Sequence, residues 1–175
     1  MKIDLHYIYS IIEKSENNIS LEENSAITIN GYLRILGGNL ITDYNEYIKE
    51  FYPGNKLIVA VDIFGGIYAI SNNDFIGDSE DIWYFAPDSL EWEDLEIDYT
   101  QLINWAGSKD MLDFYKSFMF KNINQLIKEL DINEGILIYP FLWAEQCNIE
   151  TAEKKIVSIK ELIKINADYE KQLKY

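Results

Sequence analysis

The sequence predicts a single α+β domain in which an antiparallel β-sheet meander packs against helices. Its 175 residues are a length typical of one domain, and 48% of them are hydrophobic, enough to fill a core. Strand-like apolar segments follow one another between residues 26 and 93 with connections too short for βαβ crossovers. Helical patterns occupy both ends of the chain, which indicates helices packed on a sheet.

A helix and a β-hairpin are the first elements predicted. Apolar residues recur at helical spacing over 4–14, which indicates an amphipathic helix. Asn30 and Gly31 then separate two strand-like segments, 26–29 and 32–36. Asn-Gly favours a type I′ hairpin turn, because both central residues of that turn need a positive φ.

The middle of the chain predicts one more helix and then a run of strands. Thr42 is expected to cap a short helix that Pro53 and Gly54 terminate. The predicted strands are 57–61, 67–70, 81–85 and 90–93. The first of them is β-branched and apolar, which is typical of a central strand covered on both faces.

The last third of the chain is mostly helical. One short helix is expected to end at Gly107, and Ser108 is expected to cap a longer one that reaches Phe118. A further helical stretch covers 126–130, and 135–139 reads as a late strand. Ser158 with Glu three residues later is a capping box that opens a C-terminal helix.

Composition excludes several classes of function. With 30 Asp and Glu against 15 Lys and Arg, the net charge is −15, which repels nucleic acid and favours either a basic partner or simple solubility. One Cys and one His rule out a disulfide framework and a Cys-rich zinc site. No metal or cofactor is expected. The start of the chain is unlike a secretory signal, and no apolar run approaches the ~18 residues of a membrane span, so we expect a cytoplasmic protein without a membrane partner.

Two acidic segments are candidates for chemistry. Glu91 and Glu93 share one face of a strand, where they suit acid–base catalysis or a hard cation, although their alternation with Leu90 and Trp92 is also what a half-buried strand requires. The acidic and amide side chains of the second segment are Asn72, Asp74, Asp78, Glu80 and Asp81. A polar hairpin loop is favoured there over a calcium loop, because Ile76 and Trp83 stand at ligand positions.

Asp62 precedes the glycine pair Gly65 and Gly66. A phosphate loop needs a following helix, whereas here another strand follows, so Asp62 is expected to cap a tight turn. Aromatic residues gather in the middle of the chain and should mostly fill the core. Any that stay exposed beside acids suit a basic protein or a cationic ligand.

Four segments resemble, in the same order, stretches of a bacterial family of unknown function. They are Gly31–Gly38 with Leu-Arg-Ile-Leu-Gly, Asp62–Ile70 with Asp-x-x-Gly-Gly, Trp83–Glu93 with Tyr-Phe-Ala-Pro-Asp-x-Leu-Glu-Trp-Glu, and Tyr139–Trp143 with Tyr-Pro-x-Leu-Trp. The resemblance runs from about Gly31 to the C-terminal helix and departs from the family at Gly38, where Ser is common. It implies no activity, because that family has none assigned.

The order of strand, Asp, Gly-Gly, aromatic strand, acidic turn and tryptophan more loosely resembles the SUKH superfamily. That resemblance implies an α+β domain without catalytic residues. Many SUKH domains are identified as immunity proteins that bind and neutralise bacterial toxins. It therefore implies a protein partner, and the charge of −15 suits a basic toxin domain.

Three hypotheses follow. In the first, a basic protein binds an acidic face formed by Glu91, Trp92, Glu93 and Asp94, with Asp74, Asp78, Glu80 and Asp81 in the adjoining loop. In the second, a hydrolase-type enzyme uses Asp62, Asp88 and Glu91 in a glycine-lined cleft. In the third, the chain is a structural subunit of a larger assembly. An enzyme needs a concave pocket with a perturbed carboxylate, whereas a binding protein needs an exposed patch.

Overall fold

The computed structural model describes residues 3–174 apart from 14, 16, 23 and 24. The helices are α1 (Leu5–Ile12), α2 (Gly38–Lys49), α3 (Tyr99–Ala106), α4 (Asp110–Phe114), the 3₁₀ helix η1 (Tyr115–Phe118), α5 (Ile123–Ile127) and α6 (Ile159–Leu173). The strands are β1 (Ile19–Glu22), β2 (Ala26–Ile29), β3 (Leu33–Leu36), β4 (Leu57–Asp62), β5 (Ile67–Ile70), β6 (Ile82–Ala86), β7 (Glu91–Asp94), β8 (Glu134–Tyr139) and β9 (Glu153–Ser158).

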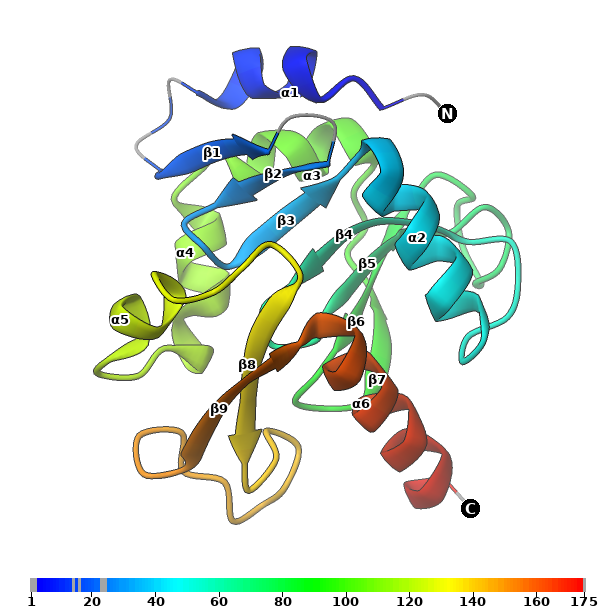
Figure 1. The fold of residues 1–175 in the computed structure, drawn as a ribbon. Coiled ribbons are helices and arrows are strands. Elements are labelled where there is room, and N and C mark those ends of the chain that lie inside the picture. The colour runs from blue at the N-terminus through cyan, green and yellow to red at the C-terminus, as the bar shows by residue number, and fades with distance from the viewer. Residues whose placement is uncertain (1–2, 14, 16, 23–24, 175) are drawn as a thin grey trace.

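The main sheet is an antiparallel meander. Its seven strands lie in the order in which they occur in the sequence, β1 to β7, and each pairs antiparallel with the next (Figure 1). The predicted α+β fold with an antiparallel meander packed against helices is therefore confirmed. Strands β1 and β7 are therefore the two edge strands, at opposite ends of the sheet.

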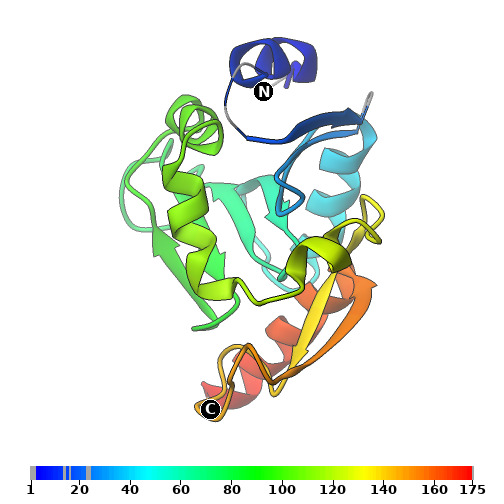
Figure 2. The same cartoon turned by 90° about the vertical axis from the view of Figure 1, so that its left-hand side faces the viewer.

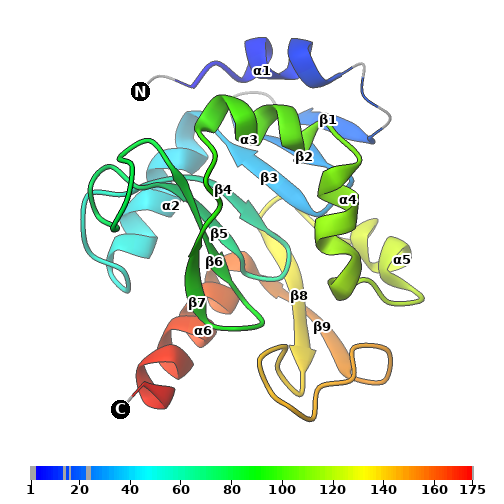
Figure 3. The ribbon, with the colours of Figure 1, turned by 180° about the vertical axis from the view of Figure 1, so that it is seen from behind.

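Helices cover both faces of this sheet. Helices α2 and α6 lie on one face, and α3 and α4 lie on the other, as Figure 3 shows from behind. Successive strand residues point to opposite faces, so that Ile35 enters the core beneath α1 and α3 while Leu36 enters the core beneath α2 and α6. Apolar residues on both faces explain why the central strands read as nearly continuous apolar runs.

Strands β8 and β9 form a separate hairpin below the main sheet and beside α6 (Figure 2). The backbone N–H of Ile136 donates to the carbonyl of Ile63 at 2.7 Å, which docks the hairpin against the β4–β5 turn. Gly135 makes this approach possible, since a Cβ there would overlap the Ile63 carbonyl oxygen. The strand at 135–139 was predicted. Its partner β9 was not, because charged residues fill its first half.

The predictions for the N-terminal region are confirmed with one omission. Asp4 accepts a hydrogen bond from the Tyr7 N–H and caps α1, whose predicted last residue, Lys14, lies outside the described residues. Asn30 and Gly31 have φ values of +51° and +76°, as the predicted turn requires. Strand β1 was missed, because its alternating half-polar residues give only a weak strand signal.

Some boundaries differ from those predicted. Helix α2 begins at Gly38 and not after Thr42, because the preceding turn already packs its apolar side chains on the second core. The long helix expected after Ser108 breaks into α4 and η1, although the Ser108 hydroxyl still accepts from the Asp110 N–H at 3.2 Å. Ser158 caps α6 as predicted, accepting from the Glu161 N–H.

Candidate functional site

Asp62, the last residue of β4, is completely buried at 0% exposure. Its Oδ1 accepts hydrogen bonds from the backbone N–H groups of Phe64 and Gly66, at 2.9 and 2.8 Å. Gly65, between them, has a φ of +89°, which a glycine adopts without strain. The prediction that Asp62 caps this turn is confirmed.

The other oxygen of Asp62 joins a buried group of tyrosines. Oδ2 accepts from the hydroxyls of Tyr84 and Tyr115, each at 3.0 Å, and the Tyr68 hydroxyl lies 2.7 Å from that of Tyr115. Burial raises the pKa of Asp62, while its four hydrogen bonds act in the opposite direction. The carboxylate thus links β4, β6 and η1, which is a structural role.

The three carboxylates of the hydrolase hypothesis lie in different surroundings. Asp88 is exposed in the β6–β7 turn, and Glu91 is exposed at the start of β7. Asp62 is in the interior with both oxygens occupied. Among the described residues, no hydrogen bond joins Asp62 to Asp88 or Glu91. The structure does not bring these three described residues into one cleft, so their geometry does not favour the hydrolase.

The acidic strand β7 presents its side chains to two sides. Glu91 and Glu93 lie opposite Ala86 and Tyr84 and are exposed on the α3 side of the sheet. Trp92 and Asp94 alternate with them and face the α2 side. The predicted acidic face is therefore split by the sheet. Charged side chains on an edge strand also discourage pairing with another sheet.

Asp74 anchors the loop between β5 and β6. Its carboxylate accepts from the backbone N–H groups of Asn55 and Lys56 at 2.7 and 3.0 Å, and it forms an ion pair with Lys56 Nζ at 2.8 Å. Both side chains of this ion pair are largely buried. Asp74, which the sequence predicts to bind a partner, makes these contacts within the protein.

The loop anchor gives a pH-dependent prediction. Burial acts to raise the pKa of Asp74, but hydrogen bonds from Asn55 and Lys56 outweigh it and lower the pKa to about 2. Because the folded pKa is below the unfolded value of about 3.9, the stabilisation from Asp74 is present above about pH 4 and is lost as the pH falls toward 2. In urea unfolding, the wild type should lose more stability over this window than Asp74→Asn. Parallel pH profiles of the two proteins would contradict the assignment; exposed Asp88→Asn is the control.

Aromatic stacking fixes the same loop from its other side. The ring of Phe75 stacks on Trp83 with 4.4 Å between centroids and also lies 5.1 Å from Trp92. Trp92, predicted as a binding anchor, is half-buried in this cluster together with Phe85. The next residue, Ile76, is 95% exposed. A well-held loop thus presents an apolar side chain directly to solvent.

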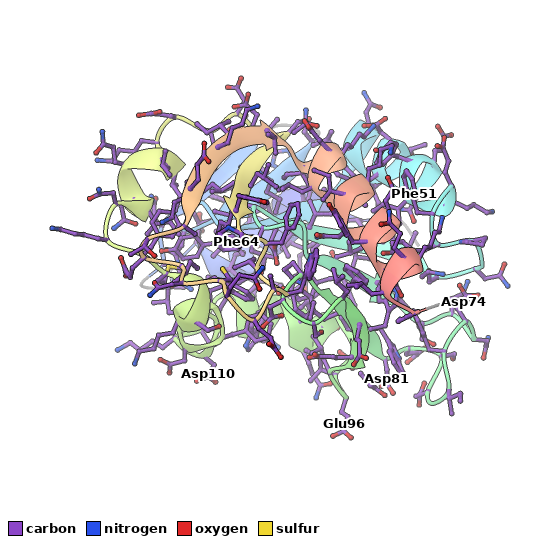
Figure 4. All side chains as sticks on the ribbon, turned by 90° about the horizontal axis from the view of Figure 1, so that it is seen from below. Phe51, Phe64, Asp74, Asp81, Glu96 and Asp110 are labelled. Carbon is purple, nitrogen blue, oxygen red and sulfur yellow. The ribbon has the colours of Figure 1, made fainter. Side chains whose placement is uncertain are left out.

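Two acidic side chains lie beside Gly77, the residue that follows Ile76. A Cβ on Gly77 would lie 3.4 Å from Asp94 Oδ2 and 3.8 Å from Asp81 Oδ2, so both carboxylates flank the loop end. Figure 4 shows Asp81 and Glu96 extending from the same border of the molecule. We call the group formed by Ile76, Asp78, Glu80, Asp81 and Asp94 the Ile76 tip.

Sequence reasoning named the acids of the tip but missed Ile76. The available signal was a large apolar residue between the polar residues of a loop, at a position that the strand pattern does not place in the core. Its exposure depends on the loop path, because the adjacent Phe75 turns inward while Ile76 turns outward.

Metal and thiol chemistry find no support in this arrangement. In the part of the chain that the structure describes, no group of three His, Cys, Asp or Glu side chains is placed to hold a metal ion. The loop acids Asp74 and Asp78 bind backbone N–H groups instead. Burial raises the pKa of the Cys147 thiol, against a smaller opposing effect of Lys154, which disfavours the thiolate form. None of the described helices is both long and apolar enough to cross a membrane.

Comparison with known proteins gives a family but no activity. Residues 17–162 match the family described as protein of unknown function DUF2625, beginning ahead of Gly31. The chain is 34% identical over 138 residues to the uncharacterized protein YbfG of Escherichia coli (strain K12), covering 76% of this chain and 63% of that protein. It is 29% identical over 140 residues to an uncharacterized protein of Haemophilus influenzae, covering 74% and 61%. The chain thus spans less than two thirds of the length of these relatives.

Proposed function

We propose that this chain, which belongs to the DUF2625 family of proteins of unknown function, is a cytoplasmic protein-binding domain that recognises a basic protein through the Ile76 tip. The observation that carries the proposal is the 95% exposure of Ile76 on an anchored, acid-rimmed loop. An apolar centre with a polar rim is the usual composition of a protein–protein contact.

The tip is already ordered, which favours binding. Phe75 is stacked on Trp83, and Asp74 is held by Lys56, so little loop entropy is lost on association. Burying the side chain of Ile76 in a partner pocket would contribute about 1.5–3 kcal/mol. The tip therefore offers one strong anchor at a low ordering cost.

The acidic residues near Ile76 indicate the sign of the partner's charge. The tip carries four carboxylates, and the whole chain has a net charge of −15, so a basic surface would be attracted and an acidic one repelled. Such complementarity mainly increases the association rate and weakens with salt.

The specific partner we propose is a basic toxin domain, with this chain as its immunity protein. The support is the loose resemblance to SUKH domains together with the acidic tip. The test is a growth assay. Bacteria express the partner, once it has been isolated by affinity capture, either with or without this chain. Rescue by the wild type and not by Ile76→Ser supports the immunity role, whereas a partner that is harmless to cells contradicts it.

Binding itself is tested by affinity capture of the tagged chain from a bacterial lysate at low and high salt, followed by titration of the purified partner. We expect a stoichiometric basic protein whose affinity falls at least about tenfold with Ile76→Ser, the size expected for an interface anchor. Asp81→Lys should mainly slow association.

The matched control is Leu112→Ser, which removes a partly exposed apolar side chain on α4, away from the tip. Equal loss of affinity in Ile76→Ser and Leu112→Ser would contradict the proposed surface. So would a partner that is acidic or that binds more tightly as salt rises.

A further inference from the structure

A cavity of about 280 Å³ with polar and apolar lining lies against β1, β2 and β3, at the end of the main sheet opposite to the Ile76 tip. Ser20, Thr28 and Arg34 are directly opposite one another on these three strands, so they form a polar row on one sheet face. The connection that follows α5, residues 127–132, lies along the same cavity.

Arg34 is a buried cation with unused hydrogen-bonding capacity. It is only 3% exposed, and among the described residues no carboxylate forms an ion pair with it. Nη1 and Nη2 donate to the carbonyls of Gly31 and Asp131 at 3.4 and 3.2 Å, and Nε has no partner. A guanidinium has five N–H groups, so several remain available.

The electrostatics around Arg34 keep it charged. Burial lowers its pKa to about 10, and the smaller effects of Tyr44, Asp62 and Glu134 oppose this shift. A guanidinium with this pKa is still protonated at neutral pH. A buried charge without an ion-pair partner is costly, and an anion in the adjoining cavity would remove that cost.

We propose that this cavity binds a small organic anion whose carboxylate or phosphate group contacts the Arg34 guanidinium and the Thr28 hydroxyl. The parallel N–H groups of a guanidinium match the paired oxygens of either head group. The hydroxyls of Thr28 and Ser20 form no hydrogen bond with a described residue and are available to the same oxygens.

The rest of the lining sets the size and character of the ligand. Ile127, Leu130 and Ile132 give the cavity an apolar side, which suits a short hydrocarbon body. Among the described lining residues, Lys128 adds a second positive charge to that of Arg34, against the negative charge of Glu22. The cavity volume of about 280 Å³ is far above the roughly 10–15 Å³ that a single water needs, so a small ligand has room there.

The test is titration of the full chain with butanoate, monobutyl phosphate and neutral butanamide, followed by amide NMR shifts and calorimetry. We expect saturable one-to-one binding of at least one anion, with shifts confined to residues 18–34 and 127–132, and none with butanamide. The anion bound more tightly identifies the head group. Arg34→Lys should weaken binding at least about tenfold, because it loses the paired donors.

Two further variants, Thr28→Val and Lys128→Gln, alter only the rim of the cavity. They test the proposal even if the Arg34→Lys protein does not fold. Each should weaken anion binding several-fold, while Ile76→Ser, at the other end of the sheet, should leave it unchanged. Equal binding of butanamide, binding unaffected by the rim variants, or no saturable binding of either anion at millimolar concentration would overturn the proposal.

Discussion

Replacement of Asp62 by Asn is expected to destabilise the fold by about 2–6 kcal/mol, since two buried donors lose their acceptor and each such loss costs about 1–3 kcal/mol. The carboxylate accepts from two backbone N–H groups and from the hydroxyls of Tyr84 and Tyr115. An Asn side chain offers one accepting oxygen, and its NH₂ group would face donors. At least two buried donors then lose their acceptor.

Thermal and urea unfolding check this prediction. For a chain of this size, each kcal/mol corresponds to about 2–4 °C, so we expect the melting temperature to fall by roughly 10 °C. Tyr115→Phe should cost less by itself and should be non-additive with Asp62→Asn, because the two side chains share one hydrogen bond. Exposed Asp88→Asn should change stability by less than about 0.5 kcal/mol. Equal effects of Asp62→Asn and Asp88→Asn would remove the structural role assigned to Asp62.

Gly135→Val is expected to cost about 3 kcal/mol, the upper part of the range for overpacking. Strand propensity by itself would favour the Val variant. Gly135 lies in β8 with a backbone conformation outside the left-handed region, and Val is a good strand residue. The cost comes from a tertiary contact. A side chain at this position would overlap the carbonyl oxygen of Ile63 and press on Leu162.

The matched control is Lys155→Val on β9, an exposed position of the same hairpin. It also introduces a residue of higher strand propensity but meets no clash, so it should be neutral or slightly stabilising. Urea midpoints of the two variants and amide exchange at Ile136, whose N–H bonds to Ile63, check the prediction. A Gly135→Val protein as stable as the wild type, with Ile136 still protected, would contradict it.

The candidate sites were predictable where the chemistry is local. Asp62 was expected to cap a turn because a carboxylate three residues before a glycine pair reaches the free N–H groups of that turn, and it does. Its tyrosine partners were not predictable, since Tyr84 and Tyr115 come from β6 and η1. The acids near Ile76 were named from the sequence, but Asp74 turned out to pair with Lys56.

By itself, the sequence determined the fold class and the main local elements. Period-two and helical patterns, the Asn30–Gly31 turn and the caps at Asp4 and Ser158 act over a few residues, so their physics is contained in neighbouring side chains. The sequence alone also showed the acidic net charge, the single Cys and single His, and the likeness to a family of unknown function.

Only the tertiary structure decided which polar residues are free to act. Burial and hydrogen bonding depend on segments far apart in the chain, which no local pattern encodes. Packing therefore places Asp62 in the interior and exposes Ile76 on an anchored loop. It also divides the acids of β7 between two sheet faces and leaves the Arg34 guanidinium beside a cavity without an ion partner among the described residues.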